Sequence, residues 1–301
     1  MATSAAPFID SMTAPFVHVI GASGRSGAAL AAALGARVVP VVRDPAKWAA
    51  LSPSIPPRTA DLTETKDLGE ALCDATHIVS CAHARHAPRI IAAAPREARL
   101  VFLGSTRRYT RWPDAHGDGV IAGEAAFLAS GRDGVMLHPT MIYGAEGEDN
   151  VRRLARLARR LPVLPLPGGG RSLVQPIYQG DVTRCLLAAL DHAWSGPHTM
   201  VIAGPEPLSY RDFLRAVAAA SGAGDPWVVA MPAGPLIALA GLARFLPGLP
   251  RVEGAEIRRL LEDKAFDITA MRAVLGVAPI PLREGLARTF APDHGPGSRK
   301  P

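Results

Sequence analysis

The chain has 301 residues, of which 48% are hydrophobic and 20% charged, and its formal net charge is +6. This length and apolar content suffice for one sizeable core, either a large α/β domain or a domain with an appendage. So small a charge over this length gives no reason to expect nucleic acid as a partner, whereas it is compatible with an anionic cofactor or a membrane surface.

Neither the cysteines nor the chain ends indicate a secreted protein. The three cysteines are an odd number without the spacing of a metal site, and we expect Cys73, Cys81 and Cys185 to be reduced, mostly buried thiols. Residues 1–15 contain no Lys or Arg and no long apolar stretch, which predicts a disordered leader rather than a signal peptide. A disordered tail is predicted over 292–301. We therefore expect a cytoplasmic protein without a bound metal ion.

The first predicted element is a strand that runs into a glycine-rich turn and a helix. The strand FVHVI (Phe16–Ile20) is followed by GASGRSG and by an Ala/Leu-rich helix over Ala28–Leu34, which Gly35 is expected to cap. Glycines let the backbone turn tightly and approach phosphates, and a helix N-terminus offers N–H groups and a positive dipole end. The order strand, turn, helix therefore predicts a dinucleotide pyrophosphate site. Its candidate residues are Gly21, Ser23, Gly24, Arg25, Ser26 and Gly27.

Short apolar strands then alternate with helices through the first half of the chain. This alternation predicts an α/β fold with a Rossmann-like, doubly wound parallel sheet. The further strands are expected at Arg37–Val42, His77–Cys81, Leu100–Leu103 and Gly134–Leu137, and the helices at Asp67–Ala75, Pro88–Ala94 and Ala122–Ala129. Ligands of such sheets bind beyond the carboxyl ends of the strands. The segments expected there are Gly21–Gly27, Arg43, Cys81–His86, Gly104–Thr106 and His138–Thr140.

After Gly144 the pattern indicates a small C-terminal α/β lobe. Its predicted helices are Val151–Leu161, Val182–Leu190 and Tyr210–Ala220, and its predicted strands lie in SLVQPIY, at His198–Ile202 and in WVVAM. We assign residues 16–145 and about 172–204 to a dinucleotide-binding domain. Residues 146–171 and 205–291 are assigned to the lobe, which we expect to bind the substrate.

Charged residues after the second strand indicate which dinucleotide binds. An NAD site usually carries an acidic residue about 20 positions after the glycine turn, which binds the ribose 2′-OH. Here Arg43 directly follows the second strand, and Arg25 lies in the turn itself. Lys47 adds a further positive charge. Guanidinium groups favour a 2′-phosphate through charge and bidentate hydrogen bonds, so NADP(H) is favoured and NAD(H) is the alternative. Asp44 opposes this assignment, unless it caps the helix that begins PAKW.

Other candidate cofactor residues follow the later strands. Asp61 is expected either near the adenine or as a residue that forms a turn or caps a helix. The remaining candidates, chosen by their position after strands, are Leu62, Cys81, Ala82, Pro139 and Thr140.

Several pieces of the chain carry a resemblance to a known family. They are GASGRSG, VVRDPAK, TADLTE, HPTMIYG, LPVLPLPGGGRSLVQPIYQGDV, IAGPEPLSYRDFLRAV and PLREGLA. Through these pieces the chain, from about Phe16 to Phe290, resembles the extended and atypical short-chain dehydrogenase/reductases. It is most similar to the branch of the nucleotide-binding accessory subunit of respiratory complex I, and next to the NmrA-like proteins. The resemblance implies a Rossmann-like domain with a small lobe over the nicotinamide end, and Pro139 and Thr140 beside the nicotinamide.

The resemblance also implies a catalytic set of a Ser or Thr, a Tyr, and a Lys four residues after the Tyr. Ser105 and Thr106 stand at the first position. Aligning AHGDGVIAGEAAF with the family pattern on its Gly and Glu places His116 at the Tyr position and Val120 at the Lys position. Valine supplies no charge, so the usual lowering of the tyrosine pKa is lost.

Three interpretations follow from this departure. His116 replaces the tyrosine as the acid, because imidazole titrates near neutral pH; or Tyr109 donates the proton; or no hydride chemistry occurs. A histidine in a Gly/Asp-rich loop is more often a surface residue than a catalyst. The leading hypothesis is an NADPH-dependent oxidoreductase acting on a small or hydrophobic carbonyl-type substrate. The alternative is a non-catalytic NADP(H)-binding accessory, assembly or redox-sensing protein.

Two further features bear on partners. The helix Val151–Leu161 carries arginines around an apolar stripe, which indicates either a solvated basic face or a surface for anionic lipid. Together with the apolar helix Pro235–Leu249 it suggests a peripheral membrane contact. The uncharged stretch Pro226–Ala243 is interrupted by prolines and is expected to be a buried or peripheral element rather than a membrane span. After the predicted strand His77–Cys81, the chain contains His83, Arg85 and His86, which lack the spacing of a metal site.

Overall fold

The computed structural model describes residues 15–52, 54–144, 150–243 and 254–291, and the predicted leader, the predicted tail and the end of the predicted helix Pro235–Leu249 lie largely outside these ranges. The chain forms two compact units. Unit 1 comprises Met1–Ser105, Asp118–His138 and Cys185–Met200, and unit 2 comprises Thr106–Gly117, Pro139–Arg184 and Val201–Pro301. The residue limits of the two predicted domains stay a prediction.

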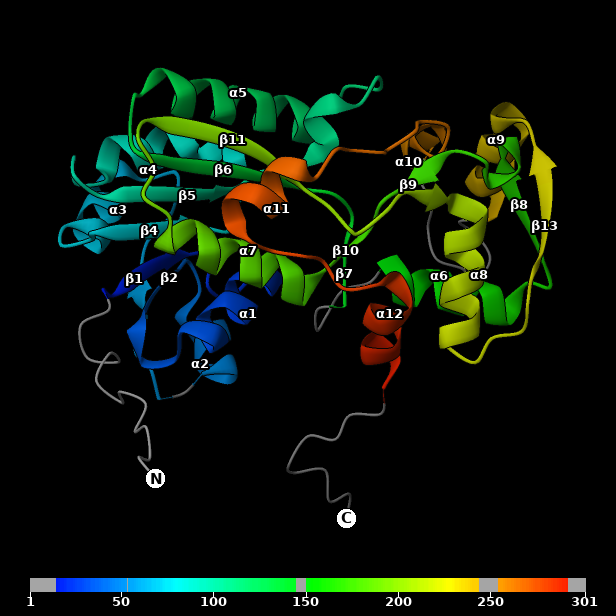
Figure 1. Ribbon diagram of the computed structural model, residues 1–301, viewed down its shortest axis with the longest axis horizontal. Helices are drawn as coiled ribbons and strands as arrows, with labels where there is room; N and C mark the ends of the chain where they lie inside the picture. The colour runs from blue at the N-terminus through cyan, green and yellow to red at the C-terminus, as the bar shows by residue number, and fades with distance from the viewer. Residues whose placement is uncertain (1–14, 53, 145–149, 244–253, 292–301) are drawn as a thin grey trace, which may run out of the picture. The chain divides into compact units, whose positions relative to one another are not determined.

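Unit 1 is built on a seven-stranded sheet in the order β11-β6-β5-β4-β1-β2-β3 (Figure 1). The neighbouring strands from β3 to β6 all pair in parallel. The crossover between β3 and β4, on opposite sides of β1, is the reversal of strand order that defines a doubly wound sheet. The fold predicted from the sequence is therefore confirmed. The strands are β1 Val17–Ile20, β2 Val38–Val42, β3 Arg58–Thr59, β4 His77–Ser80, β5 Arg99–Leu103, β6 Gly134–Pro139 and β11 Pro197–Ile202.

Helices cover both faces of this sheet, as buried parallel strands require. Figure 1 shows α3, α4 and α5 along one face and α1 along the other. The helical segments are α1 Arg25–Leu34, η1 Gly35–Arg37, α2 Pro45–Leu51, α3 Thr65–Leu72, η2 Ala84–His86, α4 Ala87–Ala93, α5 Ala115–Ala129 and α7 Gln179–Asp191.

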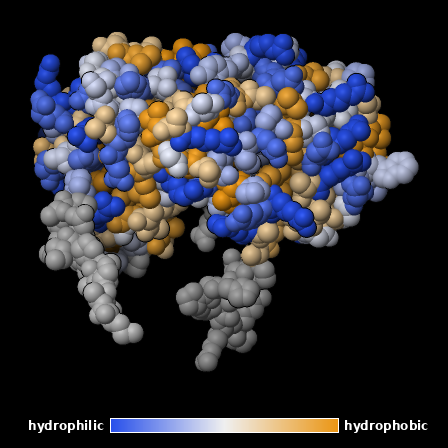
Figure 2. All heavy atoms as spheres, in the orientation of Figure 1, coloured by the Kyte–Doolittle hydropathy of each residue, from blue (hydrophilic) through white to orange (hydrophobic). Residues whose placement is uncertain are grey.

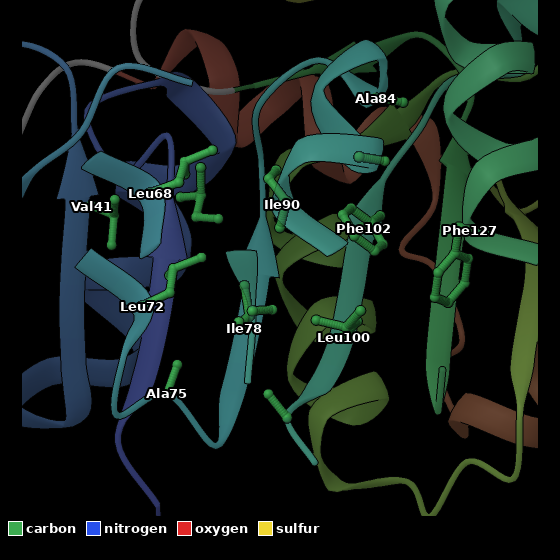
Figure 3. Packing of buried hydrophobic residues seen from close by; sticks show 14 of the residues in the cluster. Val41, Leu68, Leu72, Ala75, Ile78, Ala84, Ile90, Leu100, Phe102 and Phe127 are labelled. Carbon is green, nitrogen blue, oxygen red and sulfur yellow. The ribbon is translucent and has the colours of Figure 1, made fainter. Parts of the chain in front are cut away.

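Alternating strand residues divide the core of unit 1 into two layers. Ile78, Leu100 and Phe102 point to the side of α3, α4 and α5, where they join one buried cluster (Figure 3). In that cluster the rings of Phe102 and Phe127 meet edge to face, with centroids 5.1 Å apart. Each such buried side chain contributes about 1.5–3 kcal/mol of transfer free energy. The intervening residues are buried on the opposite face: Val19, Val79, Val101 and Val135.

Helix α5 begins earlier than the sequence predicted. The expected start was Ala122, but the helix already includes His116 in its first turn, so the assignment of His116 to a loop was wrong. The glycines of this segment lower its helix propensity, which is why the helix was not predicted here. They allow close packing, since a Cβ at Gly123 would lie 2.0 Å from the carbonyl oxygen of Ala84. Asp114 marks the start, because its Oδ1 accepts a hydrogen bond from the Gly117 N–H at 2.8 Å.

Unit 2 combines two-stranded sheets with helices around a core of its own. β13 pairs in parallel with β8, β10 in parallel with β7, and β12 antiparallel with β9. The predicted single strand in SLVQPIY is split into β9 and β10, and Pro176, which has no N–H, lies between them. The elements are η3 Thr106–Tyr109, β7 Ile142–Tyr143, α6 Asn150–Arg160, β8 Val163–Pro167, η4 Gly168–Gly170, β9 Leu173–Val174, β10 Ile177–Tyr178, β12 Leu208–Ser209, α8 Tyr210–Ala220, β13 Trp227–Met231, α9 Ala233–Ala243, α10 Gly254–Arg259, α11 Thr269–Leu275 and α12 Leu282–Phe290.

The apolar stripe of α6 packs inside unit 2. Val151, Leu154 and Ala158 are buried in one cluster with Phe213 and Val217 of α8. The arginines of α6 lie outside this core and are exposed or half-buried. The arginines thus lie on the outer face of a packed helix, and whether this face is only solvated or also binds anionic lipid stays a prediction.

The three thiols differ in burial, which was only partly expected. Cys185 is buried, Cys81 is half-buried and Cys73 is exposed, so the expectation of mostly buried cysteines fails at Cys73. Cys73 directly follows the last turn of α3 at the surface of unit 1.

Candidate functional site

The turn between β1 and α1 has the backbone geometry that its glycines permit. Gly21 adopts a φ of +77°, which lies in the left-handed region, and its N–H donates to the Val41 carbonyl at 2.9 Å. The Gly24 N–H donates back to the Gly21 carbonyl at 2.9 Å, which closes the turn. The chain therefore reverses at the carboxyl end of β1 within a few residues.

Gly27 brings helix α1 close to this turn. A Cβ at Gly27 would lie 2.2 Å from the Gly21 oxygen and 2.8 Å from the Gly21 carbonyl carbon. Both of these atoms belong to the backbone, so no side-chain rotation could relieve the overlap. Helix and strand can pack at this distance only with glycine at position 27.

The N-terminus of α1 is arranged to receive an anion. Gly24 occupies the N-cap position without a side-chain acceptor, and the first turn of the helix carries no acidic residue. The first N–H groups of a helix have no partner within the helix, and they carry the positive end of its dipole. Arg25, at the first helical position, is exposed. This arrangement fits the pyrophosphate of a dinucleotide.

The end of β4 lies directly beside the glycine turn. The Cys81 N–H donates to the Ile20 carbonyl at 2.9 Å, and a Cβ at Gly21 would lie 3.2 Å from the Ala82 nitrogen. Burial raises the pKa of the Cys81 thiol to about 12, so this group is neutral at physiological pH. Cys81 and Ala82 are therefore two uncharged residues that lie next to the turn, and Cys81 is not a nucleophile there.

At the end of β2 two basic side chains are exposed, whereas the one acidic side chain caps a helix. Arg43 and Lys47 are both exposed. The Asp44 Oδ1 accepts hydrogen bonds from the N–H groups of Ala46 at 3.0 Å and Lys47 at 3.2 Å, which makes Asp44 the N-cap of α2. The capping role considered for Asp44 is confirmed, and its Oδ1 is bonded to the backbone rather than free for a ribose hydroxyl.

Asp61 forms a local turn. Its Oδ1 accepts from the N–H and the hydroxyl of Thr63, each at 2.8 Å, and these bonds lower the pKa of the carboxyl group. This contact agrees with the turn-forming alternative. A role of Asp61 and the adjacent Leu62 at the adenine stays a prediction.

His138 near the end of β6 and Glu124 of α5 form a buried pair that was not predicted from the sequence. His138 and Glu124 are almost completely buried, at 0% and 3% exposure, and the His138 Nε2 lies 3.4 Å from a Glu124 carboxylate oxygen. On the other side of the ring, Nδ1 accepts a hydrogen bond from the Ser105 N–H at 3.2 Å. A lone Glu within an Ala-rich helix and a His at the end of an apolar strand are the signals that could have revealed the pair.

The remaining candidates belong to unit 2 and are described within it. The Thr106 hydroxyl donates to the Pro139 carbonyl at 3.1 Å, and the Thr140 hydroxyl donates to the Gln175 carbonyl at 2.5 Å. Both hydroxyl protons are therefore donated to backbone carbonyl groups of unit 2. Tyr109 is 48% exposed, and the Arg108 guanidinium lies 4.6 Å from the centre of its ring. His116 is half-buried in the first turn of α5.

Val120, at the position that the resemblance gives to lysine, lies in the core of unit 1. It is 1% exposed and belongs to the cluster that contains Phe102 and Phe127. This environment would strongly disfavour a charged ammonium group. Within unit 1 the structure thus brings the turn Gly21–Gly27 next to Cys81 and Ala82. Separately, it brings Ser105 next to His138.

The ring of His83, which follows β4, accepts hydrogen bonds from a neighbouring residue. The His83 Nδ1 accepts from the N–H and the guanidinium of Arg85, at 3.0 and 3.2 Å. Across the residues that the structure describes, no three His, Cys, Asp or Glu side chains gather as metal ligands would. In the same residues no helix combines the length and the hydropathy needed to cross a bilayer.

Comparisons with known proteins bear on the fold. No protein-family model and no curated protein matches the chain. Among solved structures, the NADPH-dependent quinone oxidoreductase QOR2 of Escherichia coli, complexed with NADPH, matches with a TM-score of 0.70 and 19% identity, over 91% of this chain and 100% of that chain. The triphenylmethane reductase of Citrobacter sp., complexed with NADP(H), matches with 0.70 and 14%, over 91% and 99%.

A third structure is a short-chain dehydrogenase/reductase superfamily protein of Agrobacterium tumefaciens with bound NAD. It matches with a TM-score of 0.67 and 16% identity, over 91% of this chain and 95% of that chain. At these identities the likeness establishes the fold alone, a Rossmann-like fold that the chain shares with these three proteins over about 91% of its length.

Proposed function

We propose that this chain, which has the Rossmann-like fold of short-chain dehydrogenase/reductase structures, binds NADP(H) at the turn between β1 and α1. One observation carries the choice of NADP(H): Arg43 is exposed directly after β2, while the neighbouring Asp44 uses its carboxylate to cap α2. A site for NAD(H) needs a free carboxylate near this position, and a site for NADP(H) needs a guanidinium.

The proposed binding roles follow from the geometry of unit 1. Gly21, Gly24 and Gly27 let the backbone approach the pyrophosphate, and the N-terminus of α1 faces its charge. Arg25 and Arg43 bind the 2′-phosphate, which an arginine can hold with two parallel hydrogen bonds. Lys47 contributes charge at longer range. NAD(H) remains the alternative cofactor, since a matched structure contains NAD.

The activity that we propose is reduction of a small or hydrophobic carbonyl-type substrate, for which NADPH supplies the hydride. Two of the matched structures are reductases that bind NADPH or NADP(H), one of them acting on quinones. Ser105 and Thr106 would orient the substrate or the ribose, with Pro139 and Thr140 next to the nicotinamide. His116 or Tyr109 would supply the proton that the reduced substrate takes up.

A non-catalytic role is the second candidate, and the environment of Val120 favours it. Because Val120 is part of the hydrophobic core, this position cannot provide the positive charge that lowers the pKa of a catalytic tyrosine. In this case the chain would retain NADP(H) as an accessory, assembly or redox-sensing protein. The loss of the usual charge and the preservation of the glycine turn are both compatible with this role.

An assay of NADPH oxidation separates the two candidates. The protein is mixed with NADPH and a panel of aldehydes, ketones and quinones, and the absorbance of the reduced nicotinamide is followed. The enzyme hypothesis predicts turnover that His116→Ala or Tyr109→Phe lowers by about 100-fold or more, the usual contribution of a general acid. Binding of NADPH without turnover of any member of the panel would favour the non-catalytic role.

A peripheral membrane contact is also proposed, but only through charge. The apolar stripe of α6 is packed against α8 and cannot enter a bilayer. Arg152, Arg156, Arg159 and Arg160 are exposed on the helix. On the face drawn in Figure 2, hydrophilic residues are interspersed with smaller groups of hydrophobic ones. The exposed arginines of α6 would bind anionic lipid by charge attraction, which salt screens.

Flotation with anionic vesicles tests this contact. At low salt we expect the protein to float with the vesicles, and we expect Arg156→Glu combined with Arg160→Glu to leave it in the lower fraction. Vesicles of neutral lipid serve as the control. No flotation of the unmodified protein with anionic vesicles at low salt would remove the proposal.

A further inference from the structure

The proposed binding of NADP(H) leaves one buried polar pair of unit 1 without a role. Glu124 of α5 and His138 of β6 are 3% and 0% exposed, and their facing atoms are 3.4 Å apart. A carboxylate is costly to bury even when it is paired, and two apolar side chains of the same volume would often be as stable. The pair therefore calls for an explanation beyond the stability of the core.

The hydrogen bond from Ser105 fixes the state of the imidazole. The Ser105 N–H donates to the His138 Nδ1 at 3.2 Å, so Nδ1 carries no hydrogen. In the neutral ring the hydrogen is then on Nε2, which faces the Glu124 carboxylate. His138 thereby links a side chain of α5 to the backbone at the end of β5.

Gly104 leaves room for the ring in this position. A Cβ at Gly104 would lie 2.5 Å from the His138 Nδ1 and 2.7 Å from its Cε1. The Gly104 N–H donates to the Leu137 carbonyl at 2.7 Å, which continues the ladder between the two strands past their ends. The ring therefore packs closely against the backbone of the segment that carries Ser105.

We propose that Glu124 and His138 are positioning residues for Ser105. The carboxylate orients the imidazole, and Nδ1 of the imidazole fixes the Ser105 N–H and, with it, the place of the Ser105 hydroxyl at the carboxyl end of β5. The role rests on the proposed function, in which Ser105 orients the substrate or the ribose. Neither residue belongs to the proposed pyrophosphate or 2′-phosphate sites, so we expect the pair to influence turnover more than the affinity for NADPH.

Two substitutions of His138 separate positioning from a merely structural role. In His138→Asn, the amide oxygen can take the place of Nδ1 and accept from Ser105, while the contact with Glu124 is lost. In His138→Gln, the longer side chain can bring its N–H₂ group to the place of Nε2, while the acceptor for Ser105 is lost. The two variants are matched in polarity and both remove the ring.

The experiment measures hydrogen exchange of the Ser105 amide in the full-length protein without cofactor, together with kcat and with KM for NADPH. We expect His138→Gln to speed exchange at Ser105 by about tenfold or more and to lower kcat, with KM for NADPH unchanged. The variant His138→Asn should keep exchange at Ser105 close to that of the unmodified protein and retain more of kcat. Thermal unfolding monitors the integrity of both variants.

The outcomes distinguish the inference from the proposed function. Unchanged exchange at Ser105 in His138→Gln, or equal effects of the two variants, would overturn the positioning role. Failure of the unmodified protein to bind NADPH would instead contradict the proposed function, and the exchange measurement would still decide whether the pair positions Ser105.

Discussion

Replacing Gly27 by alanine is expected to abolish NADP(H) binding and to destabilise unit 1. The added Cβ would lie 2.2 Å from the Gly21 oxygen and 2.9 Å from the Ala22 Cα, and none of these backbone atoms can rotate away. Helix α1 must therefore move away from the end of β1, which would cost about 1–3 kcal/mol or more of unfolding free energy. The N–H groups at the helix N-terminus would move with it, and we expect affinity for NADPH to fall by at least about 100-fold.

Gly69→Ala is the matched control for this prediction. Gly69 lies within α3, and nothing lies within 4 Å of a Cβ added there. Because alanine is favoured over glycine in a helix, this variant should be as stable as the unmodified protein or more stable by up to about 1 kcal/mol. Urea unfolding and titration with NADPH measure both variants. Tight NADPH binding by Gly27→Ala would show that the turn is not the pyrophosphate site.

The second large effect is expected for Arg43→Ala, which should weaken binding of NADPH and leave binding of NADH nearly unchanged. A hydrogen bond to a charged group contributes about 1.5–3 kcal/mol, which corresponds to a roughly 10- to 150-fold loss of affinity. NADH has no 2′-phosphate and loses none of this interaction. Calorimetric titrations with NADPH and with NADH give the ratio of their two dissociation constants.

Arg37→Ala provides the control at the opposite end of the same strand. Arg37 immediately precedes β2, whereas Arg43 immediately follows it, and the two substitutions remove the same charge. Arg37→Ala should leave the preference between the nucleotides unchanged. If both variants weakened NADPH equally, the effect would reflect the net charge of the protein rather than a contact at the carboxyl end of β2.

The glycine turn and the cap of α2 could be predicted from the sequence because each is a local arrangement. The order of strand, glycines and helix defines the turn within a few residues, and Asp44 before a proline-led helix is a common N-cap pattern. The parallel sheet could be predicted as well, because buried strands read as largely apolar runs such as VVPVV and RLVFL.

The start of α5 and the pair of Glu124 and His138 could not be predicted in the same way. Gly117, Gly119 and Gly123 lower the helix propensity of AHGDGVIAG, and only the tertiary fold shows that one of them packs against Ala84. Glu124 and His138 are 14 positions apart and lie on different elements, so their contact depends on how α5 packs on the sheet. Long-range pairs of this kind leave no periodic signal in one sequence.

The central claim is that the turn between β1 and α1 binds NADP(H), with Arg43 on the 2′-phosphate. Calorimetric titration of one preparation of the unmodified protein with NADPH and with NADH tests it most directly. The account predicts that NADPH binds at least about tenfold more tightly, because only NADPH offers a phosphate to the guanidinium. Equal affinities, or tighter binding of NADH, would contradict it.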